Sequence, residues 1–148
     1  MSTNHLAEDV IELLMQLIEI PSFSGEESQT ADCIQNWLHS KGIETQRIQN
    51  NVFALNKHYD PSKPNLLLNS HHDTVLPNKA YTRDPHKAEI IDGKLFGLGS
   101  NDAGGALVSL LGLFVHFYAS ENLTYNLIIA ATAEEESSGP NGLILSLI

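Results

Sequence analysis

Three short segments of the sequence gather imidazole and carboxylate side chains next to apolar runs. They are HHD at residues 71–73, ND at 101–102 and EEE at 134–136. Imidazole and carboxylate groups bind divalent metal ions and transfer protons in hydrolytic reactions. Taken together, the three segments predict a zinc-type hydrolase centre assembled from distant parts of the chain.

Each segment also has an ordinary structural interpretation when it is considered alone. The HHD segment could be a polar strand end, Asp102 could cap a helix, and EEE could be an acidic loop in water. In an extended segment His71 and Asp73 point to one face and His72 to the other, so that Asp73 could orient the His71 ring. A divalent cation near the glutamates would offset their mutual repulsion.

Apolar spacing predicts the elements that must position these groups. Helices are expected over residues 3–19, between a Ser24–Glu27 capping box and Gly42, and over 103–118. Strands are expected at 51–56, 65–70 and 124–132, a hairpin around Asp92-Gly93, and a further helix beginning in NGLILSLI at 141–148.

The order of these elements defines a fold class and a place for the site. Strands alternate with helices, which predicts an α/β fold. The apolar runs at 65–70 and 124–132 are typical of strands buried on both faces. Ligands of such sheets bind beyond the carboxyl ends of the strands, and HHD and EEE follow these two runs.

Composition excludes several classes of protein. The 148 residues are enough for one domain, and 18 acidic against 8 basic residues give a net charge of -10, which disfavours nucleic acid and anionic membrane as partners. The single cysteine, Cys33, excludes an internal disulfide and a cysteine-ligated zinc site.

The sequence shows neither a recognisable targeting segment nor a nucleotide-binding motif. The longest nearly apolar segment, 106–119, is too short to cross a bilayer, and the first residues do not resemble a secretory signal, so a cytoplasmic location is expected. The segment GLGSND lacks the third glycine of a dinucleotide fingerprint, which disfavours a nucleotide-binding domain.

Three motifs, in this order, resemble those of the co-catalytic zinc amidohydrolases: SHHDTV, GLGSNDAGG and ATAEEESSG. That family includes acetylornithine deacetylase, succinyl-diaminopimelate desuccinylase, aminoacylase and carboxypeptidase G. The segment IPSFSGEE also resembles the family's usual start. The resemblance implies a mixed, largely parallel sheet flanked by helices, as in the catalytic domain of zinc exopeptidases.

The resemblance also implies a role for each residue of the site. His71 would bind one metal ion, Asp73 would orient His71, and Asp102 would bridge both ions. Glu136 would bind the second ion, and Glu135 would be the general base. The implied cofactors are two divalent cations, zinc or alternatively cobalt.

Two further details follow from the resemblance. A cis peptide bond is expected between Asp102 and Ala103. Gly104 stands where the family often has lysine, and Glu134 stands where aspartate is more common.

The implied reaction is hydrolysis of a small N-acyl amino acid, favouring an N-acetyl or N-succinyl ornithine or citrulline type. A dipeptidase or carboxypeptidase, and a non-catalytic metal-binding or interaction fragment, remain alternatives. Family chains are longer and add a further acidic ligand, a lid or dimerisation domain and a late histidine ligand. Residues 1–148 are therefore expected to form the N-terminal part of a catalytic domain, in a protein that dimerises through the additional domain.

Overall fold

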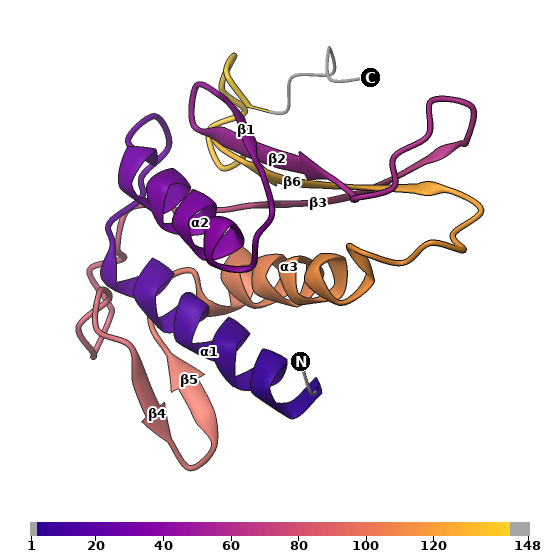
Figure 1. The fold of residues 1–148 in the computed structure, drawn as a ribbon. Coiled ribbons are helices and arrows are strands. Elements are labelled where there is room, and N and C mark those ends of the chain that lie inside the picture. Colours follow the sequence, from indigo (N-terminus) through magenta and orange to yellow (C-terminus); the bar gives the residue numbers. More distant parts are fainter. Residues whose placement is uncertain (1–2, 143–148) are drawn as a thin grey trace.

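The computed structural model describes residues 3–142, in which a four-stranded sheet lies over three helices (Figure 1). The helices are α1 (Thr3–Glu19), α2 (Ser28–Ser40) and α3 (Gly105–Phe117). The sheet strands are β1 (Gln46–Ile48), β2 (Asn51–Leu55), β3 (Asn65–His71) and β6 (Asn126–Thr132). A separate hairpin pairs β4 (Glu89–Ile91) with β5 (Lys94–Phe96).

The sheet is mixed, which confirms the predicted α/β class. Its order is β1-β2-β6-β3, and only the β3–β6 pair is parallel among the pairings of the described strands. The expectation that parallel pairs would dominate therefore does not hold for this part of the sheet. A short turn joins β1 to β2 as an antiparallel ladder, whereas α3 lies in the crossover that the parallel pair requires.

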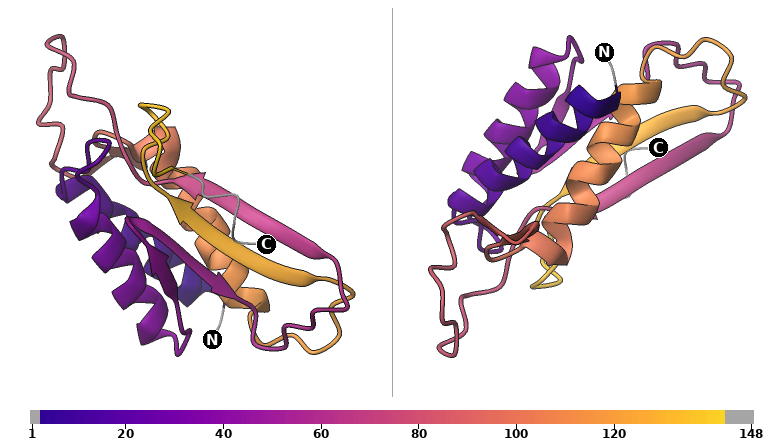
Figure 2. Two further views of the ribbon diagram at one scale, coloured as in Figure 1. Left: turned by 90° about the horizontal axis from the view of Figure 1, so that it is seen from above. Right: turned by 90° about the horizontal axis from the view of Figure 1, so that it is seen from below.

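All three described helices lie on the same face of the sheet (Figure 2). Helix α1 buries one stripe of its surface, formed by Leu13, Leu14, Leu17 and Ile18. Helix α3 is apolar around most of its circumference because it packs against both α1 and the strands β3 and β6. The core between these layers includes the fully buried Leu107, Leu111 and Phe114.

Strand β6 occupies the interior of the sheet, and all seven of its residues are buried, as its continuous apolar run predicts. The same prediction is wrong for β3. Its Leu66 and Leu67 are 45% and 38% exposed. Within residues 3–142, β3 has β6 on one side only, and the helices cover only one face of the sheet.

Three of the predicted helices are present in the described residues, and two of them differ from the prediction at their ends. Helix α1 has the predicted bounds, but α2 begins at Ser28 without a side-chain cap, so the predicted capping box is wrong. Ser24 instead donates to Asp73, and Glu27 accepts from backbone N–H groups outside the helix. Strand β1 was not predicted, because three residues are too few to show periodicity.

The Asp92-Gly93 hairpin is present, and both turn residues have positive φ, as a tight two-residue turn requires. The helix predicted to begin in NGLILSLI falls mostly on 143–148, outside the described residues. No helix in the described part of the chain is both long and apolar enough to cross a membrane.

Candidate metal centre

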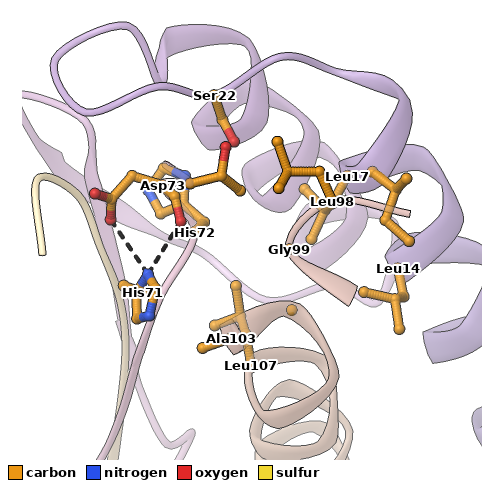
Figure 3. Close-up of a pocket in the computed structure, with 13 residues that line it drawn as sticks. Leu14, Leu17, Ser22, His71, His72, Asp73, Leu98, Gly99, Ala103 and Leu107 are labelled. Carbon is orange, nitrogen blue, oxygen red and sulfur yellow. Dashed lines mark hydrogen bonds and ion pairs between the residues drawn. The ribbon is translucent and has the colours of Figure 1, made fainter. Parts of the chain in front are cut away.

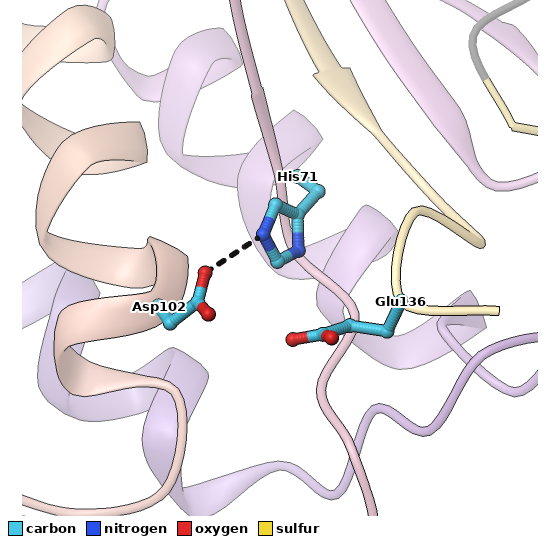
Figure 4. A group of neighbouring side chains, drawn as sticks. All are labelled: His71, Asp102 and Glu136. Atoms are coloured by element: carbon cyan, nitrogen blue, oxygen red, sulfur yellow. Dashed lines mark hydrogen bonds and ion pairs between the residues drawn. The ribbon is translucent and has the colours of Figure 1, made fainter. Parts of the chain in front are cut away.

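Three chain segments meet at one end of the sheet and bring His71, Asp102 and Glu136 together (Figure 4). The parallel register pairs His71 with Thr132, so the carboxyl ends of β3 and β6 lie side by side. Asp102 lies in a wide, kinked turn, η1 (Ser100–Gly104), which leads into α3. One ligand atom from each of the three side chains lies within 4.8 Å of the other two.

The His71 ring lies between two aspartates. Its Nδ1 atom is 3.1 Å from the backbone carbonyl oxygen of Asp73 and 3.3 Å from the Asp73 carboxylate (Figure 3). Its Nε2 atom is 3.2 Å from Asp102 Oδ1 and 3.7 Å from Glu135 Oε2. When the Nδ1–H group donates to Asp73, Nε2 is left to bind a metal ion, which is the tautomer that a ligand requires.

This arrangement fits a cation. In the neutral tautomer the Nε2 lone pair faces two carboxylate oxygens, so the three electron-rich atoms repel one another unless a proton or a metal ion lies between them. A nitrogen from His71 and oxygens from Asp102 and Glu136 form a donor set that zinc-type ions accept. The residues present therefore fit a divalent metal ion.

The electrostatic effects on the site point in the same direction. Partial burial raises the pKa of Glu136, and the neighbouring Asp102 carboxylate raises it further. Burial by itself would lower the pKa of His71, but contacts with Asp73, Asp102 and Glu135 outweigh this effect and the pKa is raised. A bound divalent cation would favour the ionised carboxylates and the neutral imidazole.

Asp73 is fully buried and does more than face His71. Its carboxylate accepts hydrogen bonds from the Ser24 hydroxyl at 2.7 Å and from the backbone N–H groups of Glu135 and Glu136 at 3.1 and 3.0 Å. The same side chain therefore contacts the His71 ring and the backbone of residues 134–136, the glutamate turn.

The three glutamates have distinct surroundings. Glu134 has a positive φ of 54°, and its carboxylate accepts two hydrogen bonds from Asn141, away from the cluster. Glu135 projects its side chain toward His71 and is 60% exposed there. Glu136 turns toward Asp102 and His71.

Asp102 does not cap α3, since the helix has no side-chain cap and the Asp102 side chain is 80% exposed at the cluster. The peptide bond between Asp102 and Ala103 is cis, as the resemblance predicts. Beside the cluster lies an open pocket of about 210 Å³, whose lining includes Tyr81, Ser100, Asp102 and Glu136.

His72 points away from the cluster, as strand alternation predicts. Its Nε2–H group donates to the carbonyl oxygen of Asn50 at 3.0 Å, and its Nδ1 atom lies 2.9 Å from the Thr30 hydroxyl. Burial lowers the pKa of His72 to about 4, so the ring is neutral at pH 7. His72 therefore belongs to the packing of α2 against the sheet and not to the metal cluster.

Two residues at the site were not predicted to lie there. Ser24 donates to Asp73, and Glu27 accepts from the backbone N–H group of Glu134, although both residues were interpreted as a helix cap. The only signal in the sequence was their place in IPSFSGEE. The roles of ligand, bridge and general base given to His71, Asp73, Asp102, Glu135 and Glu136 remain predictions.

Comparisons with known proteins agree with this geometry. Residues 67–147, more than half of the chain, match the family described as Peptidase family M20/M25/M40. The chain is 34% identical over 142 residues to a succinyl-diaminopimelate desuccinylase from Corynebacterium glutamicum, covering 93% of this chain and 37% of that protein. It is 34% identical over 140 residues to an acetylornithine deacetylase from Proteus mirabilis, covering 86% of this chain and 36% of that protein.

A solved structure shows the same fold. The Bacillus subtilis YXEP protein, described as a dinuclear metal binding peptidase from the M20 family, has a TM-score of 0.69 and 20% identity, over 94% of this chain and 38% of that one. The chain thus spans little more than a third of the length of these proteins. On the family match and the shared fold together, the chain belongs to peptidase family M20/M25/M40.

Proposed function

We propose that this chain supplies part of the active site of a metal-dependent hydrolase that removes the acyl group from a small N-acyl amino acid. The observation that carries the proposal is the convergence of His71, Asp102 and Glu136, with Glu135 beside His71. The names of the two relatives support acetyl or succinyl as the acyl group.

Four residues would bind or position the metal ions. His71 and Asp102 would hold one divalent cation, and Asp102 and Glu136 a second, most simply zinc; the peptidase from Bacillus subtilis, described as dinuclear, supports the number two. When bound, such ions polarise the amide carbonyl and lower the pKa of water. Asp73 holds the His71 ring in the ligating tautomer.

Glu135 is suited to move the proton. Its carboxylate is exposed to solvent yet lies 3.7 Å from His71 Nε2, so it can reach a water molecule at the cluster. It would take the proton of the attacking water and return it to the departing amine. The adjacent pocket of about 210 Å³ gives room for a small substrate.

Hydrolysis of a dipeptide is the second candidate, and the description of the family as peptidases favours it. A non-catalytic metal-binding or interaction fragment is a third, because the cluster offers each cation only two of the three protein ligands that catalytic zinc usually has. Dimerisation through a further domain and a cytoplasmic location remain predictions.

The test is an assay of metal stoichiometry and of hydrolysis of N-acetylornithine, N-succinyl-diaminopimelate and a dipeptide. It is run on this chain and on the longest reading frame that contains it. Two bound ions with turnover of an acylated amino acid support the proposal. Turnover of the dipeptide alone favours the peptidase, and metal binding without turnover in either form favours the fragment.

Glu135→Gln tests the general base. Because the amide cannot accept the proton, we expect turnover to fall by about 10²- to 10⁴-fold while the metal content is unchanged. Glu121→Gln, in the loop before β6 at the far end of that strand, is the matched control and should retain turnover. Activity of Glu135→Gln at the level of the control would show that another group takes the proton.

A further inference from the structure

A second buried carboxylate, Glu27, lies outside the metal cluster and is fully buried. Its Oε1 atom accepts hydrogen bonds from the backbone N–H groups of Gly25 at 2.7 Å and Glu134 at 3.0 Å. Its Oε2 atom accepts from the Asn50 side-chain amide at 2.8 Å. Burying a carboxylate is costly unless it is well bonded, so its presence here calls for a reason.

We propose that Glu27 is a positioning residue that fixes the glutamate turn, residues 134–136, so that Glu135 and Glu136 point to the metal centre. This inference rests on the proposed function. Glu27 does not belong to the ligand cluster and acts through the backbone of Glu134.

The backbone N–H groups of the glutamate turn are held by buried carboxylates. Three consecutive N–H groups each donate to a buried carboxylate: Glu134 to Glu27, and Glu135 and Glu136 to Asp73. Hydrogen bonds from backbone N–H groups to ionised carboxylates are stronger than those to neutral acceptors. Two fully buried side chains therefore determine the path of the backbone, and with it the directions in which Glu135 and Glu136 project.

The Glu27 carboxylate links the glutamate turn to two other segments through hydrogen bonds. Gly25 belongs to the loop before α2, and Asn50 belongs to the turn between β1 and β2. The carbonyl oxygen of Asn50 in turn accepts from His72, the neighbour of the ligand His71. The glutamate turn is thus held against the end of β3 by contacts that do not involve the metal ligands.

The chemistry requires a carboxylate at position 27. All three of its partners are donors, and an ionised carboxylate only accepts. A glutamine has one acceptor oxygen and one NH₂ group, so either Asn50 or the two backbone N–H groups would face a donor. Glu27→Gln should therefore loosen the turn with almost no change in side-chain volume.

The experiment compares wild-type chain, Glu27→Gln and the exchanged pair Glu27→Gln/Asn50→Asp. In the exchanged pair the NH₂ group of the glutamine at position 27 can donate to the aspartate at position 50. The glutamine oxygen can still accept from the backbone N–H group of Glu134. Two quantities are measured: the affinity for Zn²⁺ by titration calorimetry, and the rate of amide hydrogen exchange in residues 134–136.

Asn126→Asp provides the matched control. Asn126 is also fully buried and also bonds several backbone groups, but it lies at the other end of β6, near Asp60 and Lys63. The control exchanges an amide for a carboxylate at a comparable buried network, so it reports how general destabilisation affects Zn²⁺ binding.

We expect Glu27→Gln to lower the Zn²⁺ affinity at least about tenfold and to speed exchange at 134–136, with both effects reversed in the exchanged pair. Asn126→Asp should leave both quantities near the wild-type values. If Glu27→Gln does not fold, Asn50→Ala should give a smaller change in the same direction. It removes the bond to Glu27 Oε2 and a bond from Arg47, but keeps both backbone bonds of Glu27.

Several results would overturn the proposal. It fails if Glu27→Gln binds Zn²⁺ as tightly as wild type with unchanged exchange at the turn, or if Asn126→Asp weakens binding equally. If neither this chain nor the longest reading frame that contains it binds Zn²⁺, the proposed function fails instead, and hydrogen exchange at 134–136 still decides whether Glu27 holds the turn.

Discussion

The three consecutive glutamates carry the same side chain and lie in three different environments. Glu134 bonds Asn141, Glu135 faces His71 and water, and Glu136 joins the metal cluster. Their backbone N–H groups donate hydrogen bonds to two buried carboxylates, those of Glu27 and Asp73. The turn separates the three side chains, and two of them lie at the candidate metal centre, where a cation would offset their mutual repulsion.

The two adjacent histidines differ in pKa: that of His71 is raised and that of His72 is lowered. His72 is neutral in the folded protein because burial lowers its pKa to about 4, whereas the ordinary histidine value is 6.5. The unfolded chain therefore binds one more proton than the folded chain between these two values. Stability contributed by the neutral ring is complete above the unfolded pKa and is lost as the pH falls toward 4.

We expect this residue alone to lower the free energy of unfolding by about 2 kcal/mol between pH 7 and pH 5. Urea denaturation at both pH values, on wild type and on His72→Asn, measures it. The variant should be less stable at pH 7 and should lose less stability on acidification. An equal loss in both proteins would mean that other groups cause the acid sensitivity.

At the scale of elements, the entry to α3 depends on close approach of η1 to α1. A Cβ atom on Gly104 would lie 2.6 Å from Leu14 Cδ1 and 2.7 Å from the carbonyl oxygen of Gly99. The turn that carries Asp102 therefore packs against α1 with no space for a side chain at position 104. The lysine that the resemblance would place there does not fit this packing.

Gly104→Ala should accordingly destabilise the protein by about 1–3 kcal/mol, because the backbone of η1 must shift to relieve the contact. Thermal or chemical unfolding measures the loss, and Zn²⁺ titration should show weaker binding through the displaced Asp102. Gly112→Ala, inside α3, is the control, since its Cβ atom would meet only the Val10 side chain, at 3.1 Å, and no backbone atom. Equal stability of the two variants would contradict the close packing of η1.

At the scale of the whole molecule, the helices cover one face of the sheet, and β3 forms an edge of the described part (Figure 2). Leu66 and Leu67 of this edge strand are substantially exposed. Exposed apolar edge strands pair with other chains, so we expect this 148-residue chain to self-associate as its concentration rises.

Leu67→Lys should reduce that association, because a charge on an edge strand opposes pairing. Sedimentation velocity at several concentrations measures the effect, and the free energy of unfolding should change by no more than about 0.5 kcal/mol because the site is exposed. Ile11→Lys, on an exposed position of α1, is the matched control and should leave association unchanged. Identical association of all three proteins would exclude the β3 edge as the contact.

Local patterns accounted for much of the fold. The periodicity of α1, the apolar run of β6 and the Asp92-Gly93 turn are properties of neighbouring residues, and each element appears where it was predicted. The exposure of β3 was mispredicted because an apolar run does not say which partners will cover it. Ser24 and Glu27 were mispredicted because a local cap and a distant hydrogen bond use the same side chains.

The sequence by itself determined the chemical types of the site, the order of its segments and the family motifs they match. Only the tertiary structure decided that His71, Asp102 and Glu136 come within 4.8 Å of one another, and that Glu27 reaches the backbone of Glu134. The physical reason is that residue type and spacing govern local conformation, whereas these contacts join segments about 30 to more than 100 residues apart and depend on strand register and packing.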